Sequence, residues 1–195
     1  MFTPAFLAAS SIEIICPDIG ALSIDVAYGG NFYAIIESQK NYFGLNNYRA
    51  EELISFSREI RDKINKKYAN RFIHPIDKSI RDISHVLWTG QVLDNESSSR
   101  NAVFYGDKAI DRSPCGTGSS ARMAQLFSQN KLKVGEVFIH ESYIGSKFVC
   151  RIEKSSKIHN MDGISPVIRG WAKIHGYNKI IVDSSDPFYK GFQVI

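Results

Sequence analysis

The residues best suited to chemistry lie in one short stretch, from Asp111 to Gly118. The pattern that follows predicts a helix over residues 117–130, so Cys115 stands just before a helix N-terminus. Unpaired backbone N–H groups and the positive end of the helix dipole favour a thiolate there. We therefore expect Cys115 to be a thiol that can take up and release a proton.

The same helix start is suited to an anion beside the sulfur. Backbone N–H groups of Gly116, Thr117 and Gly118 can hold a substrate carboxylate, and glycine permits its close approach. Glycines at a helix start also suit phosphate, but the stretch lacks both the G-x-x-x-x-G-K-[ST] pattern and the third glycine of a dinucleotide fingerprint. An isolated cysteine is often an inert buried residue, so the residues alone leave both interpretations of Cys115 open.

Composition narrows the class of protein. The chain has 195 residues, 44% hydrophobic, which is enough for one domain core, and a net charge of +4 that is scattered along the sequence. No basic stripe indicates nucleic acid, and the apolar stretches are shorter than the ~20 residues that span a bilayer. The first nine residues only faintly resemble a secretion signal, because no basic residue precedes the apolar ones.

The cysteines indicate a reducing compartment. Cys16, Cys115 and Cys150 are an odd number at wide spacing, without a C-x-x-C pair. This pattern predicts neither a disulfide framework nor a zinc site. We expect a cytoplasmic protein with no metal, in which Cys16 and Cys150 are inert.

The elements that must position these residues predict an α+β domain. Residues 50–68 carry apolar side chains every three or four positions, which is typical of an amphipathic surface helix. The helix over residues 117–130 has Arg122 as its only charged residue, so it should be enclosed. Residues 94–100 are polar and are predicted to form a loop. Strands are expected near residues 12–16, 22–26, 32–36, 82–88, 102–105, 134–142, 147–153, 167–174 and 179–182. Many strands with two helices suggest a curved β-sheet wrapped around a central helix.

The stretch from Asp111 to Gly118 resembles the second catalytic motif of the proline racemase family. Within that family the chain looks most like the bacterial 4-hydroxyproline 2-epimerases, although Ser119 stands where the family usually has threonine. The family's first catalytic motif, Met-Cys-Gly-His, does not occur in these 195 residues. Further stretches that carry the resemblance are residues 25–34, 84–90, 100–110, 138–142 and 186–192.

The resemblance implies a fold and a partner. It implies a diaminopimelate epimerase-like protein of two lobes, each a curved sheet around a central helix, with the active site in the cleft between them. Residues 1–195 would form the C-terminal lobe, and about residues 181–195 would cross back to the N-terminal lobe. The polypeptide would then be truncated, start internally, or pair with a second chain that carries the first half. A homodimer is a further expectation.

The resemblance also implies a mechanism without a cofactor. Inversion at an α-carbon needs a base on one face and an acid on the other. Cys115 would serve one face, and the cysteine of the first motif the other. Asp111 would contact the ring amine of the substrate, and Gly116 and Thr117 would donate backbone N–H groups to its carboxylate. His85 would line the substrate pocket, although a strand histidine is by pattern more often structural.

Several activities fit this resemblance. The leading expectation is epimerisation of trans-4-hydroxy-L-proline to cis-4-hydroxy-D-proline, with the substrate distinguished near His85 and a turn at Trp88-Thr89-Gly90. Proline racemase is the nearest alternative, and a catalytically inactive remnant is another. The related 3-hydroxyproline dehydratases resemble the chain less, because they carry threonine where Cys115 stands. His140 is expected to be structural.

Overall fold

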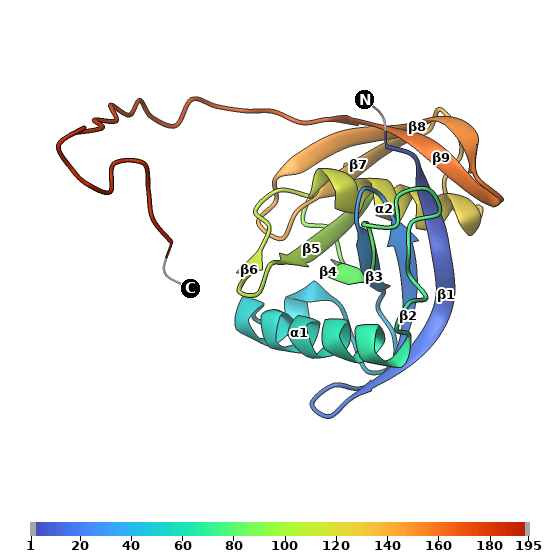
Figure 1. The fold of residues 1–195 in the computed structure, drawn as a ribbon. Coiled ribbons are helices and arrows are strands. Elements are labelled where there is room, and N and C mark those ends of the chain that lie inside the picture. The colour runs from blue at the N-terminus through green and yellow to red at the C-terminus, as the bar shows by residue number, and fades with distance from the viewer. Residues whose placement is uncertain (1–2, 194–195) are drawn as a thin grey trace.

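The computed structural model describes residues 3–193, most of which form a barrel (Figure 1). Its helices are α1 (Ala50–Lys67) and α2 (Gly116–Ser128), with a short 3-10 helix at Leu45–Asn47. Its strands are β1 (Ala5–Cys16), β2 (Gly20–Tyr28), β3 (Phe32–Ile36), β4 (Ile83–Gly90), β5 (Ser99–Tyr105), β6 (Ala109–Ile110), β7 (Val137–Glu141), β8 (Lys147–Ile158) and β9 (Met161–Arg169). Within residues 3–193, no helix is both long and apolar enough to cross a membrane.

The sheet closes on itself. Its strand order is β4-β3-β2-β1-β9-β8-β7-β5-β6, and β4 also pairs with β5, so eight strands form a ring and β6 adds to β5 outside it. The β3–β4 and β5–β7 pairs are parallel, whereas the other pairs in the ring are antiparallel. Closure leaves the eight strands of the ring without an open edge.

Helix α2 runs through the middle of this barrel (Figure 1). Its residues from Gly118 to Leu126 are all buried, and it packs against β1, β2 and β9. The small side chains near its start let the strands approach closely, which explains how a helix fits inside the ring. The predicted α+β class, a curved sheet around a central helix, is confirmed.

Helix α1 lies on the outside of the barrel, against β4 and β1 (Figure 1). The apolar residues that predict it, Leu53, Phe56, Ile60 and Ile64, are all buried. Glu52 accepts a hydrogen bond from the backbone N–H of Arg49 at 2.8 Å, which caps the first turn. This helix therefore covers one face of the sheet.

Several predicted boundaries are wrong. Strand β1 begins at Ala5, so the apolar N-terminal residues belong to the barrel, where Ala5 and Phe6 pair with β9. The polar loop ends at residue 98, because Ser99 and Arg100 already belong to β5. The expected turn at residues 88–90 is the end of β4. Pairing of β5 with β4 and with β7 holds both of these segments in strands, which local composition does not reveal.

The C-terminal prediction also needs correction. Strand β9 ends at Arg169, and residues 179–182 form no strand. Residues 170–193 leave the barrel as an extended, exposed segment (Figure 1). Their β-branched residues favour a strand, but a strand also needs a neighbour to hydrogen-bond with, and this segment has none within residues 3–193. Residues 194 and 195 lie outside the described part of the chain.

The turn between β2 and β3 depends on Gly29. A Cβ atom added there would lie 2.2 Å from the carbonyl oxygen of Thr117 and 2.4 Å from the amide nitrogen of Ala121, both backbone atoms of α2. We expect Gly29→Ala to lower the free energy of unfolding by roughly 1–3 kcal/mol, because backbone must move. Urea denaturation followed by circular dichroism measures this. Gly176→Ala, at a glycine with nothing within 4 Å, should be near neutral; equal stability of the two variants would contradict the packing argument.

Candidate active site at the start of helix α2

Cys115 occupies the position immediately before α2 in an uncommon backbone conformation. It is the N-cap residue, with φ 65° and ψ 119°. A positive φ is costly for a residue with a side chain, so the surroundings must impose it. The carbonyl of Pro114 accepts a hydrogen bond from Asn101 Nδ2 at 2.9 Å, and the amide of Cys115 donates to Ser113 Oγ at 3.0 Å. These two contacts fix the peptide bond that precedes Cys115, and the carbonyl of Cys115 accepts the amide hydrogen of Ser119 at 2.8 Å on its other side.

Buried polar residues support this backbone from behind. Ser119 Oγ lies 3.4 Å from the Pro114 carbonyl oxygen and 2.8 Å from His140 Nδ1. His140 is fully buried, and burial lowers its pKa to about 3, so its ring is neutral. The hydroxyl of Ser119 is thus part of the support. His140 contacts Ser119 in this buried support, a position that agrees with the expectation that His140 is structural.

The sulfur of Cys115 is surrounded by hydrogen-bonding groups. The amide of Gly118 donates to Sγ at 3.4 Å, and the hydroxyl of Tyr33 lies 3.3 Å from it. Thr117 Oγ1 is 3.7 Å from Sγ and 2.6 Å from Tyr33 Oη. Because the Gly118 amide donates to the sulfur, the amides of Gly116 and Thr117 are the donors in the first helical turn that remain for a substrate carboxylate.

Sequence reasoning missed Tyr33. It lies in β3, in a run of apolar residues that is typical of a core strand, and its side chain is fully buried. Nothing in the local pattern distinguishes it from its neighbours. The signal that identifies it is the pairing of β3 with β4, which sets Tyr33 directly beside His85.

His85 joins the same cluster through Tyr33. Their ring centroids are 4.8 Å apart, and His85 Nδ1 lies 2.7 Å from Ser84 Oγ. Burial lowers the pKa of His85, with a further lowering by Arg61 and an opposing effect of Asp111. The ring is therefore neutral near pH 7 and can offer a nitrogen to a hydroxyl group.

Asp111 lies in the loop that leads to Cys115. Its Oδ1 accepts the amide hydrogen of Ser113 at 2.8 Å, which shapes the approach to the helix. Its own amide donates to the carbonyl of Val103 in β5 at 2.8 Å. The structure thus brings Cys115, Gly116 and Thr117 together at one helix start, with Asp111 on the adjoining loop. It does not bring residues 88–90 there, because Trp88 is buried against Ser57 of α1, with its Nε1 donating to Ser57 Oγ at 2.8 Å.

The other two cysteines are unsuited to proton transfer with a ligand. Both are buried, whereas Cys115 is partly exposed. Burial, with a smaller effect of Glu59, raises the pKa of Cys16 to about 11, and burial raises that of Cys150 to about 12. Of the three thiols, Cys115 is the one that a ligand can reach.

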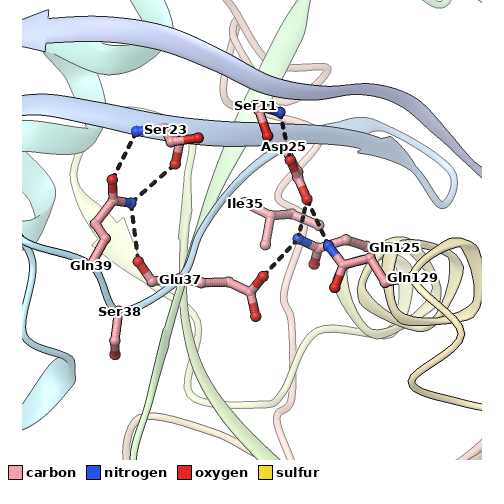
Figure 2. A pocket seen from close by; sticks show the side chains of 9 residues that line it. All are labelled: Ser11, Ser23, Asp25, Ile35, Glu37, Ser38, Gln39, Gln125 and Gln129. Atoms are coloured by element: carbon pink, nitrogen blue, oxygen red, sulfur yellow. Dashed lines mark hydrogen bonds between the residues drawn. The ribbon is translucent and has the colours of Figure 1, made fainter.

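A separate polar pocket lies beside the second half of α2 (Figure 2). It has a volume of about 240 Å³. In Figure 2 the Asp25 carboxylate receives hydrogen bonds from the amides of Gln125 and Gln129, at 2.7 and 3.0 Å. Burial acts to raise the pKa of Glu37, but Arg122, 2.8 Å away, holds it below its ordinary value. Asp25 of β2 and Glu37, which directly follows β3, both connect to side chains of α2. Gln125 is ten residues beyond Cys115, about 15 Å along the helix, so this pocket is distinct from the cysteine cluster.

Comparison with curated proteins gives relatives along nearly the whole chain. A 4-hydroxyproline 2-epimerase of Spirosoma linguale is 55% identical over 191 residues, and a 4-hydroxyproline epimerase of Brucella ovis is 53% identical over 191 residues. Each match covers 98% of this chain and 57% of the relative. The chain therefore spans a little over half the length of these relatives.

Two solved structures are similar to this chain in fold. A hydroxyproline epimerase from Agrobacterium vitis with bound trans-4-OH-L-proline has a TM-score of 0.83 at 27% identity, covering 99% of this chain and 55% of that one. A probable proline racemase from Agrobacterium radiobacter with bound carbonate has a TM-score of 0.82 at 29% identity, covering 99% and 56%. The sequence model of the proline racemase family matches residues 1–193. This chain therefore belongs to the proline racemase family.

Proposed function

We propose that this chain supplies one of two acid/base groups for epimerisation at the α-carbon of 4-hydroxyproline. The observation that carries the proposal is the partly exposed thiol of Cys115, which caps an enclosed helix. The amides of Gly116 and Thr117 beside it are in the first helical turn, where amides have no partner within the helix. The curated relatives at 53–55% identity are 4-hydroxyproline epimerases, and one similar structure holds trans-4-hydroxy-L-proline. These relatives support the choice of substrate.

The proposed reaction uses one thiol on each face of the substrate. A cysteine thiolate removes the α-proton and becomes a thiol, and the electron pair of the C–H bond passes to the α-carbon and its carboxylate. The second thiol then gives its proton to the opposite face and becomes a thiolate, which completes inversion. Cys115 takes one of these roles, and the cysteine of the family's first motif takes the other. No external oxidant or reductant is needed.

The other proposed site residues bind the two charged groups of the substrate. The amides of Gly116 and Thr117 face the carboxylate, where the helix end stabilises the charge that develops as the proton leaves. Asp111 pairs with the ring ammonium. His85, neutral and beside Tyr33, lines the pocket and offers a partner for the 4-hydroxyl group.

The proposed second lobe explains the exposed C-terminal segment. We assign residues 1–195 to a C-terminal lobe and about residues 181–195 to a crossing onto the N-terminal lobe. Large apolar side chains that are exposed in this segment support the assignment. They are Trp171, Ile174, Tyr177, Ile180, Ile181, Val182, Phe188, Tyr189 and Phe192. We place the protein in the cytoplasm, because its three cysteines are free.

Proline racemase is the second candidate, favoured by the equally close fold of the probable proline racemase. The two activities differ in how the pocket treats the 4-position. In a two-lobe enzyme we expect kcat/KM for trans-4-hydroxy-L-proline to exceed that for L-proline by about tenfold to a hundredfold. A buried polar partner left unpaired by proline costs roughly 1–3 kcal/mol.

Chiral chromatography of both products measures this preference. His85→Ala should reduce the preference more than it reduces proline turnover, and His159→Ala, at an exposed turn between β8 and β9, should leave it unchanged. Equal kcat/KM for the two substrates in the unmodified enzyme would decide for proline racemase, with Cys115 and Asp111 in the same roles.

A further inference from the structure

We propose that Tyr33 is a positioning residue that holds the Cys115 sulfur in its ionised form through a hydrogen bond, while Thr117 holds Tyr33. This inference deepens the proposed function, because it names a group that acts on the proposed catalytic thiol. Tyr33 comes from β3, on the barrel wall, and reaches the start of α2 on the barrel axis.

The contacts of the Tyr33 hydroxyl define its position. Its oxygen lies 3.3 Å from Cys115 Sγ and 2.6 Å from Thr117 Oγ1. The ring is fully buried and packs beside His85, with centroids 4.8 Å apart. At Gly118 an added Cβ atom would come 3.3 Å from Tyr33 Cε1, so a larger residue there would push against the ring. The hydroxyl is thus held between the sulfur and the helix start.

The protons of this group can be assigned when the sulfur is ionised. A thiolate only accepts hydrogen bonds, so the single hydroxyl proton of Tyr33 points to Sγ. Thr117 then donates its own hydroxyl proton to Tyr33 Oη. The Gly118 amide is the second donor to the sulfur, at 3.4 Å. Burial raises the pKa of Tyr33 well above its ordinary value, so the phenol keeps its proton while a thiol titrates.

The charged groups nearby do not replace this hydrogen bond. His85 of β4 is neutral near pH 7, because burial and Arg61 of α1 both lower its pKa. Asp111, on the loop before α2, uses its Oδ1 to accept the amide hydrogen of Ser113 at 2.8 Å, and a carboxylate offers the sulfur no hydrogen-bond donor. Stabilisation of the thiolate therefore comes from neutral donors, and hydrogen bonds to an ionised acceptor are among the stronger ones.

The first test is the pH dependence of Cys115 alkylation in the 195-residue chain. Tyr33→Phe removes only the hydroxyl, and iodoacetamide labelling of Cys115 is followed by peptide mass spectrometry. We expect labelling at pH 7 to slow by about threefold to tenfold, with the difference vanishing at high pH where the sulfur is ionised in both proteins. Tyr42→Phe is the matched control, because Tyr42 is equally buried and its hydroxyl donates to the Thr89 carbonyl at 2.6 Å, away from Cys115.

A second variant keeps the inference testable if Tyr33→Phe does not fold. Thr117→Val removes the group that orients Tyr33, so it should slow labelling in the same direction. In a protein that carries both substitutions, the effects should be less than additive. Identical labelling profiles for a folded Tyr33→Phe variant and the unmodified chain would overturn the inference, as would an equal effect of Tyr42→Phe.

The labelling test of Tyr33 and the test of the proposed function are independent of each other. Labelling reports on the thiol whether or not any substrate is turned over. In a two-lobe enzyme Tyr33→Phe should lower kcat for trans-4-hydroxy-L-proline by about tenfold and leave KM nearly unchanged, because a positioning role acts through the sulfur and Thr117, which the hydroxyl contacts, and not through the substrate. A rise in KM with constant kcat would place Tyr33 in substrate binding and contradict a positioning role.

Discussion

The 195-residue chain by itself is expected to show no measurable epimerase activity, and to gain it when joined to a family N-terminal segment that carries the first cysteine motif. The reason is geometric. In the proposed mechanism Cys115 serves one face of the α-carbon, and one group that removes and returns a proton on the same face restores the starting enantiomer. The buried cysteines, Cys16 and Cys150, cannot reach the other face.

The relative from Spirosoma linguale provides the partner segment. It is 55% identical to this chain, which spans 57% of its length, so the remaining part can be produced as a separate chain or fused before residue 1. Polarimetry with trans-4-hydroxy-L-proline follows the reaction. The matched control carries alanine in place of the cysteine of the first motif, which should bind equally well and remain inactive. Robust turnover by the purified 195-residue chain would contradict the prediction.

Assembly must be measured apart from activity. Residues 170–193 are exposed in this chain and include Lys173 and Lys179, at which trypsin can cut. If the segment crosses onto the N-terminal part, limited proteolysis there should slow when the two parts are joined. Protection without activity would mean that the lobes associate and the chemical proposal is wrong. If a folded fusion showed no protection and no activity, the assignment of lobes would be contradicted.

Local sequence patterns predict the helices well, since each helix depends on its own residues. The four apolar positions of α1 are all buried, and the uncharged start of α2 indicates an enclosed helix. Strand positions are predicted less well at their ends. Ser99 and Arg100 look like loop residues, yet they pair with β4 and β7. Residues 179–182 look like a strand and have no partner within residues 3–193.

Part of the candidate site could be predicted from adjacent residues, and the other part depends on the tertiary fold. The place of Cys115 before a helix follows from adjacent residues, and so does the availability of the Gly116 and Thr117 amides. Tyr33 is 82 residues away from Cys115 in the sequence, and its contact depends on how β3 lies beside α2. The support of the Pro114 carbonyl by Asn101 likewise depends on the tertiary fold. Such contacts come from barrel closure, which no local pattern encodes.

Replacing Cys115 should have a large effect in the joined enzyme. Cys115→Ala is expected to lower kcat for epimerisation by about 10²–10⁴-fold, the usual contribution of a positioned acid or base. Cys16→Ala and Cys150→Ala are the matched controls; they change buried thiols and should keep activity, at some cost in stability. Timed alkylation near neutral pH should inactivate the enzyme in step with modification of Cys115.

Deuterium exchange at the α-carbon distinguishes an enzyme that has lost the proton-transfer group on one face of the substrate from an enzyme whose whole site is inactive. In D₂O the Cys115→Ala enzyme keeps the thiol of the first motif, which can still remove the α-proton from the one enantiomer that presents it. We therefore expect slow α-deuteration of that enantiomer with retention of configuration, and no exchange in the other. Nuclear magnetic resonance of the recovered amino acids measures both. Epimerisation within tenfold of the unmodified enzyme, or equal exchange into both enantiomers, would show that a group other than Cys115 serves its face.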